Sequence, residues 1–158
     1  GMPLVINLEK GRLGSDTANV LGGLIVSAIT NAAFTRAQSS SRRPFILYID
    51  EFHNLTTDSL ADTLSEPRKY GLGLVLSQQH CQQSSKDIFA GIMGNVGTLI
   101  GFRVGVLDAP LISKQLGLQR IEGLSDLPNH RVFLRMMHQG ERTKLFSAQT
   151  FPPEIFAQ

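Results

Sequence analysis

Two adjacent carboxylates at the end of an apolar run are the residues of this chain best suited to chemistry. Asp50 and Glu51 directly follow the apolar residues 45–49. The pattern is typical of a Walker B strand, in which the first carboxylate holds the Mg²⁺ shell and the second orients or polarises the attacking water. The alternative interpretation is an ordinary acidic strand end that caps the following helix.

The phosphate-binding loop that normally accompanies a Walker B strand is missing from this chain. The pattern G-x-x-x-x-G-K-[ST], whose backbone cradles the phosphates, occurs nowhere in the 158 residues. The sequence therefore indicates part of a nucleotide-driven motor. We expect the chain on its own neither to hydrolyse ATP nor to bind it tightly.

Two more side chains suit a nucleotide site. Gln79 follows the next apolar strand, and its amide can both donate and accept a hydrogen bond, which suits a sensor of the γ-phosphate or the attacking water. Arg68 carries a planar, permanently charged fork that suits transition-state charge on the phosphate of a neighbouring subunit. The alternatives are a solvated glutamine-rich turn and an exposed basic face at Arg68 and Lys69. Lys10 and Arg12 are interpreted as part of a solvated glycine loop.

Apolar spacing predicts an alternation of strands and helices. Pro67 should kink or terminate its helix, and Gln139 and Gly140 should turn the chain into a last strand. We expect strands at 3–8, 45–49, 74–77, 97–104, 131–136 and 144–148, and helices at 15–36 (capped by Ser15 or Asp16), 58–69, 84–93 and 108–116.

This alternation predicts one α/β domain spanning residues 1–158, with a mainly parallel sheet flanked by helices and a C-terminal antiparallel β-hairpin. Ligands of such sheets bind beyond the carboxyl ends of the strands. Polar residues follow four of the predicted strands, so we expect them to meet at one edge. They are Glu9 with Lys10, Asp50 with Glu51, Gln78 with Gln79, and Arg103.

Composition narrows the function classes only slightly. The 15 Lys and Arg against 13 Asp and Glu give a net charge of +2, which is too small to predict a nucleic-acid surface by itself. The single cysteine, Cys81, excludes an intramolecular disulfide, and the four histidines show no metal-ligand spacing. The apolar stretch 20–34 contains Ser27, Thr30 and Asn31, so we predict no membrane-spanning helix. We expect a cytoplasmic location, with which the low cysteine content is consistent.

The chain resembles the C-terminal part of the motor domain of TraG/TraD-type conjugative coupling ATPases, in the HerA/FtsK group of RecA-like motors. Three stretches carry the resemblance in the order of the family: residues 7–14 (NLEKGRLG), 43–52 (RPFILYIDEF) and 66–71 (EPRKYG). Residues 74–79 (LVLSQQ) resemble the glutamine motif, and 94–109 resemble the next strand and helix. Pro67 departs from the family, which usually continues its helix through this position.

The resemblance implies an incomplete RecA-like ATPase domain that runs from Walker B to its C-terminal part, with ATP and Mg²⁺ as cofactors. Asp50 would hold Mg²⁺ through water, and Glu51 would be the catalytic carboxylate. Gln79 would be the sensor that contacts the nucleotide, and Arg68 the arginine finger acting on a neighbouring subunit.

The resemblance also implies a hexameric pump that passes DNA, single- or double-stranded, with its relaxase complex toward a type IV secretion channel. The P-loop and a segment that tethers the intact protein to the inner membrane would lie upstream. Two alternatives remain. One is a non-catalytic module that docks a relaxase or secretion partner through residues 108–146, and the other is a protein-moving motor of the same group.

Overall fold

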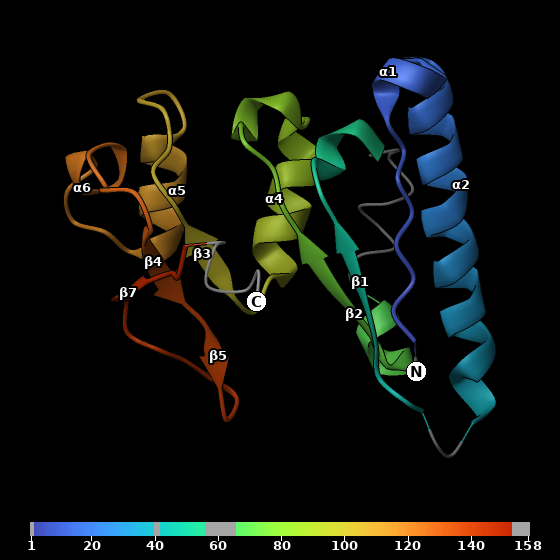
Figure 1. The fold of residues 1–158 in the computed structure, drawn as a ribbon. Coiled ribbons are helices and arrows are strands. Elements are labelled where there is room, and N and C mark those ends of the chain that lie inside the picture. The colour runs from blue at the N-terminus through green and yellow to red at the C-terminus, as the bar shows by residue number, and fades with distance from the viewer. Residues whose placement is uncertain (1, 40–41, 56–65, 153–158) are drawn as a thin grey trace. The chain divides into compact units, whose positions relative to one another are not determined.

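The structure is a computed structural model that describes residues 2–39, 42–55 and 66–152 (Figure 1). These residues form both helices and short strands, which confirms the predicted α/β class. The chain forms two compact units. Unit 1 comprises Gly1–Gln78 and Ser84–Gly91, and unit 2 comprises Gln79–Gln83 and Ile92–Gln158.

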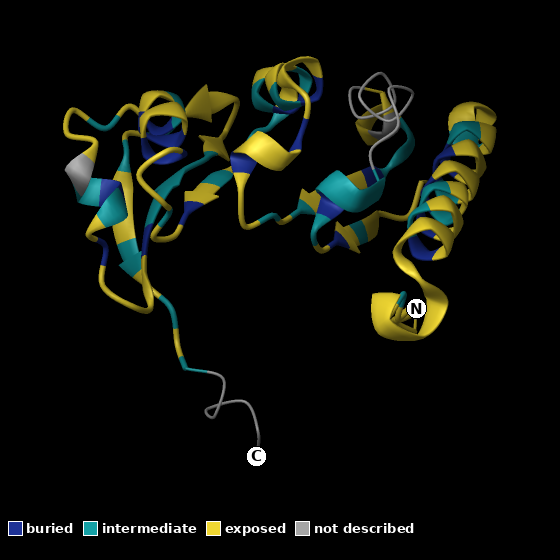
Figure 2. Cartoon of the chain, turned by 90° about the horizontal axis from the view of Figure 1, so that it is seen from above, coloured by how far each residue is buried: buried dark blue, intermediate teal, exposed yellow. Residues whose placement is uncertain are grey.

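The longest element of unit 1 is the helix α2, Ser15–Phe34, which continues as the 3₁₀ turn η1, Thr35–Gln38. Its existence and length confirm the prediction. Its start differs, because Gly14 occupies the N-cap position without a side-chain hydrogen bond, and Ser15 and Asp16 lie inside the first turn. Asp16 still favours this helix end electrostatically. The buried residues recur every three or four positions along α2 (Figure 2), and they are Ala18, Gly22, Val26, Thr30 and Ala33.

The segment before α2 differs from the prediction in two ways. Residues 3–8 form no strand. In the described range the sheet of unit 1 consists of two other strands. The predicted glycine loop contains the one-turn helix α1, Lys10–Leu13. The carbonyl of Glu9 starts this turn by accepting the N–H groups of Arg12 and Leu13, both at 3.1 Å.

The sheet of unit 1 is a parallel pair of β1, Phe45–Ile49, and β2, Leu72–Leu76. Both were predicted, although β2 begins two residues earlier than expected. Phe45 lies opposite Leu72 and Ile49 opposite Leu76. This register brings the residues that follow the two strands to the same edge of the sheet.

The connection from β1 to β2 begins with the 3₁₀ turn η2, Phe52–Leu55, and ends with η3, Pro67–Tyr70. Most of the helix predicted at 58–69 lies outside the described residues. In the described residues Pro67 begins η3, and the prediction that it kinks or ends the preceding helix concerns residues outside the described range. The fixed φ and missing N–H of Pro67 suit the first position of a helical turn.

The polar turn after β2 contains η4, Cys81–Gln83, and leads to α4, Lys86–Asn95, which begins in unit 1 and ends in unit 2. The N–H of Ile88 donates to Ser85 Oγ at 3.3 Å, so the predicted serine cap is present. The elements of unit 2 that follow are β3 (Leu99–Gly101), α5 (Ala109–Leu116), α6 (Glu122–Ser125), β4 (Arg131–Arg135), β5 (Met137–His138), β6 (Glu141–Arg142) and β7 (Phe146–Gln149).

The core of unit 2 forms where α5 and α6 pack on β3. A Cβ atom added at Gly101 would lie 3.0 Å from Leu116 Cδ1 and 3.3 Å from Leu124 Cδ1, so glycine permits this close approach. Leu116 and Leu124 are among the largest fully buried side chains of the described residues. This packing gives unit 2 its own apolar centre.

The pairing in unit 2 is antiparallel, in contrast to the mainly parallel sheet that we predicted. β3, β4 and β7 form one sheet in that order, and β5 pairs with β6 around Gln139 and Gly140. Both turn residues have positive φ, 49° and 85°, as a tight reversal requires. In the described residues only β1 and β2 pair in parallel. The sequence did not predict this, because a short apolar run indicates a strand but not the direction in which it pairs. The RecA-like arrangement and the single domain stay predictions.

By length and composition, the helical stretch Ser15–Gln38 is long and apolar enough to cross a membrane. This differs from the expectation drawn from its polar residues. One of them, Thr30, is satisfied within the helix, because its hydroxyl donates to the carbonyl of Val26 at 2.9 Å. A core helix of a soluble protein passes the same test, so the finding is weak evidence for a span.

Candidate active site

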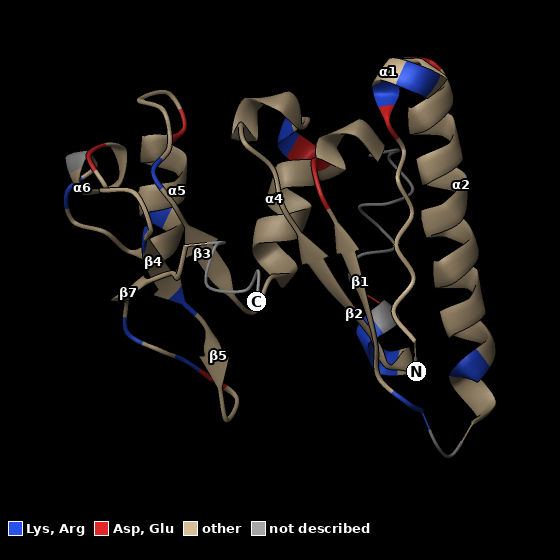
Figure 3. Cartoon of the chain, in the orientation of Figure 1, with Lys and Arg blue, Asp and Glu red and all other residues tan. Residues whose placement is uncertain are grey.

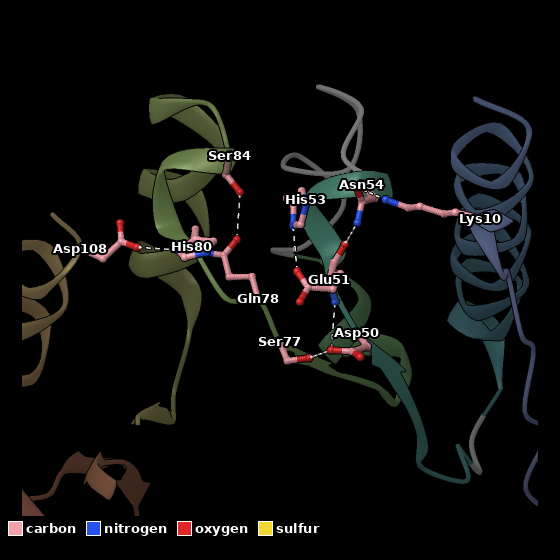
Figure 4. Close-up of polar contacts among 10 residues, drawn as sticks. All are labelled: Lys10, Asp50, Glu51, His53, Asn54, Ser77, Gln78, His80, Ser84 and Asp108. Atoms are coloured by element: carbon pink, nitrogen blue, oxygen red, sulfur yellow. Dashed lines mark hydrogen bonds and ion pairs between the residues drawn. The ribbon is translucent and has the colours of Figure 1, made fainter. Parts of the chain in front are cut away.

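Asp50 lies immediately after β1, at the edge where both parallel strands end (Figure 4). Its Oδ1 accepts two hydrogen bonds, from Ser77 Oγ at 2.5 Å and from the N–H of Glu51 at 3.1 Å. The residue is exposed, and no hydrogen bond to Oδ2 is found within the described residues. One oxygen of Asp50 is thus fixed and the other is open to solvent.

The open oxygen fits the predicted Mg²⁺ role. Mg²⁺ usually keeps several waters and takes only one or two protein carboxylates. No group of three or more His, Cys, Asp or Glu side chains in the described ranges could enclose a metal ion. A single carboxylate that acts through water is the arrangement these residues offer.

Glu51 turns the chain sharply away from β1. Its φ is 49°, in the left-handed region that residues other than glycine seldom adopt. The N–H of the buried Phe52 donates to the carbonyl of Ser77 at 3.1 Å, and the N–H of Asn54 donates to the carbonyl of Glu51 at 3.0 Å. These bonds hold the unusual backbone, as is common at functional sites.

The side chain of Glu51 lies beside His53. Glu51 Oε2 is 3.3 Å from His53 Nδ1, and both side chains are partly buried. Figure 4 shows the two side chains facing each other beside η2. The contact places the imidazole of His53 directly beside the Glu51 carboxylate.

Lys10 reaches the same edge from α1. Its Nζ donates to Asn54 Oδ1 at 2.6 Å, and Asn54 Nδ2 donates to the carbonyl of Glu51 at 3.0 Å. The interpretation of Lys10 as a solvated loop residue is therefore incomplete, since the structure places this cation one side chain away from Glu51. Arg12, on the same short helix, is exposed.

The two glutamines after β2 have different surroundings. Gln78 Oε1 accepts a hydrogen bond from the buried Ser84 Oγ at 3.1 Å, which links the end of β2 to the residues before α4. Gln79 is exposed and is the first residue of unit 2. Gln79 is linked to this edge only by its position in the chain, two residues after Ser77. The sensor role of Gln79 stays a prediction. Arg103 also belongs to unit 2.

Arg68 lies at the opposite end of unit 1. It belongs to η3, and the carbonyl of Gly71 just after η3 accepts the N–H of Phe45, where β1 begins, at 2.8 Å. Five residues of strand span about 17 Å. The structure therefore separates Arg68 from Asp50 and Glu51 of its own chain.

Several residues at this edge of the sheet were not predicted from the sequence. Ser77, His53 and Asn54 carry no motif of their own, and their contacts depend on the turn at Glu51 and on the β1–β2 register. Only Ser77 had a usable signal, since it occupies the end of a predicted strand beside that of Asp50.

The fold is similar to those of several solved ATPases. VirB4 of Thermoanaerobacter pseudethanolicus matches with a TM-score of 0.68 and 14% identity, over 94% of this chain and 41% of that one. The genome-packaging NTPase B204 of Sulfolobus turreted icosahedral virus 2, in complex with AMPPCP, matches with a TM-score of 0.55 and 17% identity, over 79% and 60%. B204 described as the DNA-packaging ATPase of Sulfolobus turreted icosahedral virus matches with a TM-score of 0.53 and 17% identity, over 76% and 59%.

These similarities concern the fold. No protein-family model matches the sequence, and no curated protein is similar to it. The chain spans about two fifths to three fifths of the structures that it matches. The expected likeness to secretion-type ATPases is confirmed at the level of the fold.

Proposed function

We propose that this chain is the carboxylate-bearing part of an ATP-driven motor of the type IV secretion class. The observation that carries the proposal is the pair Asp50 and Glu51, each held differently at the carboxyl edge of a parallel strand pair. The similarity in fold to VirB4 and to a DNA-packaging ATPase supports this class of motor.

The two carboxylates perform different tasks in this proposal. Asp50 keeps Oδ1 on Ser77 and Glu51 and offers Oδ2 to the water shell of Mg²⁺. When bound there, Mg²⁺ would supply positive charge that offsets the charge developing on the phosphates of ATP. Glu51 orients and polarises the water that attacks the γ-phosphate. Gln79 senses the γ-phosphate from the turn after β2.

Arg68 acts on the nucleotide of a neighbouring subunit. Its place at the far end of β1 and β2 from Asp50 supports an action on a site other than its own. Assembly into a ring, with six like subunits by family resemblance, would bring Arg68 to the next subunit's phosphate. Its charge then stabilises the transition state in trans.

The remaining parts come from outside the 158 residues. We propose that a P-loop supplied by further sequence of the same protein binds the phosphates, and that an upstream segment tethers the motor to the inner membrane from the cytoplasmic side. The transported partner is DNA with its relaxase complex, which the motor passes to a type IV secretion channel.

Steady-state ATPase kinetics of the full-length motor test the proposal. Glu51→Gln should lower kcat at least about 100-fold, the order of a general-base contribution, while nucleotide is still bound. Asp50→Asn should weaken Mg²⁺-dependent ATP binding. DNA should stimulate turnover by the unmodified motor. Glu141→Gln is the matched control, because it neutralises an exposed carboxylate on β6 in unit 2.

Several results would contradict the proposal or redirect it. Robust ATP turnover by the 158-residue chain alone, or full activity of Glu51→Gln, would refute the division of labour. Stimulation by a secreted protein but not by DNA would identify a protein-moving motor. A docking module would be identified by three results together. Residues 108–146 would capture a relaxase, neutralising both Asp50 and Glu51 would not affect the capture, and the protein would show no motor activity.

A further inference from the structure

Arg42 joins two separate segments at the end of unit 1 where β1 begins. Its Nη1 donates to the carbonyl of Lys69 at 2.6 Å and its Nη2 to that of Ala37 at 2.7 Å. Its Nε donates to the carbonyl of Arg36 at 3.1 Å. One side chain thus uses three donors to connect the end of η1 with η3.

Aromatic contacts reinforce the same connection. The Arg42 guanidinium lies 5.8 Å from the centroid of the Tyr70 ring, within the range of a cation–π interaction. The Tyr70 ring in turn packs edge-to-face on Phe34 of α2, with centroids 5.2 Å apart. A planar guanidinium presents five N–H donors in a fixed fork and can lie over a ring, whereas a lysine ammonium is a compact point charge without this fork.

These contacts fix the two residues that follow Arg68. Lys69 is held through its carbonyl and Tyr70 through its ring. The N–H of Lys69 also donates to the carbonyl of Glu66 at 3.0 Å, and the N–H of Gly71 donates to the carbonyl of Arg68 at 3.2 Å. Arg68 itself is exposed. Its backbone is therefore anchored while its side chain remains free to meet a partner.

We propose that Arg42 is a positioning residue for Arg68: it holds η3 against η1, so that the Arg68 guanidinium is presented in a fixed place to the neighbouring subunit. The inference rests on the proposed function, in which Arg68 acts in trans. Figure 3 shows basic residues gathered where β1 and β2 begin, at the other end of β1 from its acidic residues. Arg36 Nη1 makes one internal hydrogen bond there, to the carbonyl of Arg43 at 3.0 Å, whereas the Arg42 guanidinium makes three and bridges η1 and η3.

Arg42→Lys in the full-length motor is the test, because it keeps the charge and removes the fork. Misplacement of a catalytic group by about 1 Å can cost about 100-fold in rate. We expect kcat to fall between about 10-fold and 100-fold while KM for ATP is unchanged. Arg43→Lys is the matched control, since the Arg43 side chain makes no hydrogen bond found in the described residues, and it should leave kcat unchanged.

A double-variant comparison separates positioning from general damage. If Arg42 acts through Arg68, adding Arg42→Lys to Arg68→Ala should cause no further loss of kcat. Mixed rings give an independent readout. Glu51→Gln subunits, with an intact Arg68 clamp, should restore turnover to Arg42→Lys subunits, whose own carboxylates are intact. If Arg42→Lys fails to fold, Tyr70→Leu is the substitute test. It removes the ring that Arg42 faces, and it should also lower kcat.

The outcomes distinguish this inference from the proposed function. Full activity of Arg68→Ala would overturn the arginine-finger role and, with it, the inference. Loss of activity in Arg68→Ala with full activity in Arg42→Lys would overturn the inference alone. Equal losses from Arg42→Lys with and without Arg68 would show that Arg42 supports the fold and not the finger.

Discussion

At the scale of single residues, Asp50 and Glu51 are neighbours in the chain with different surroundings. Asp50 is exposed, and its Oδ1 is occupied by two donors. Glu51 is partly buried beside His53, and its backbone is in the left-handed region. This difference in surroundings is the reason why our proposal gives the two carboxylates the two tasks of a Walker B pair.

Ser77→Ala tests how much the hydrogen bond to Asp50 Oδ1 contributes to the binding of Mg-ATP. The hydroxyl of Ser77 donates to Asp50 Oδ1, and a hydrogen bond to a charged group contributes about 1.5–3 kcal/mol, with the low end expected at an exposed site. We expect KM for Mg-ATP of the full-length motor to rise about 10-fold, with kcat nearly unchanged, in steady-state ATPase assays. Ser77→Thr, which keeps a hydroxyl, should restore the original KM. A fall in kcat without a change in KM would contradict this role.

At the scale of elements, the patterns with long or strongly apolar signals were predictable from the sequence. α2 has twenty residues of helical spacing, and β1 is continuously apolar before two carboxylates. The segment 3–8 was not predictable, because an apolar run becomes a strand only if a neighbour pairs with it. The contacts of Asp50, Glu51 and Lys10 were equally hidden, since they depend on the β1–β2 register and on the φ of Glu51.

The helix α5 shows how one element combines buried and exposed positions of the same residue type. Leu116 is 1% exposed and packs near Gly101 of β3, whereas Leu111 is 43% exposed. Leu116→Ala should lower the free energy of unfolding of the chain by about 2–5 kcal/mol, the usual cost of such a cavity. Leu111→Ala is the matched control and should change it by less than about 1 kcal/mol. Urea unfolding followed by circular dichroism measures both, and equal losses would contradict the assigned core.

At the scale of the whole molecule, the parallel pair of unit 1 has one apolar face exposed. Side chains alternate along a strand, so the register places Ile46, Tyr48 and Val75 on the same face, and all three are exposed. Ile49 and Leu72, on the other face, are buried. Parallel sheets are normally covered on both faces. We therefore predict that the face of Ile46, Tyr48 and Val75 becomes buried in the intact motor.

Tyr48→Lys tests this prediction, because Tyr48 is 71% exposed and its replacement costs the chain little packing. In the 158-residue chain the variant should unfold at the same urea concentration as the original and bind less of an apolar fluorescent dye. In the full-length motor it should lower ATP turnover or assembly, because a charge would then be buried against an apolar surface without a partner. Val106→Lys, at a position 78% exposed in unit 2, is the control and should leave the motor active. A fully active, fully assembled Tyr48→Lys motor would show that this face stays in water, and that the parallel pair needs no further cover to work.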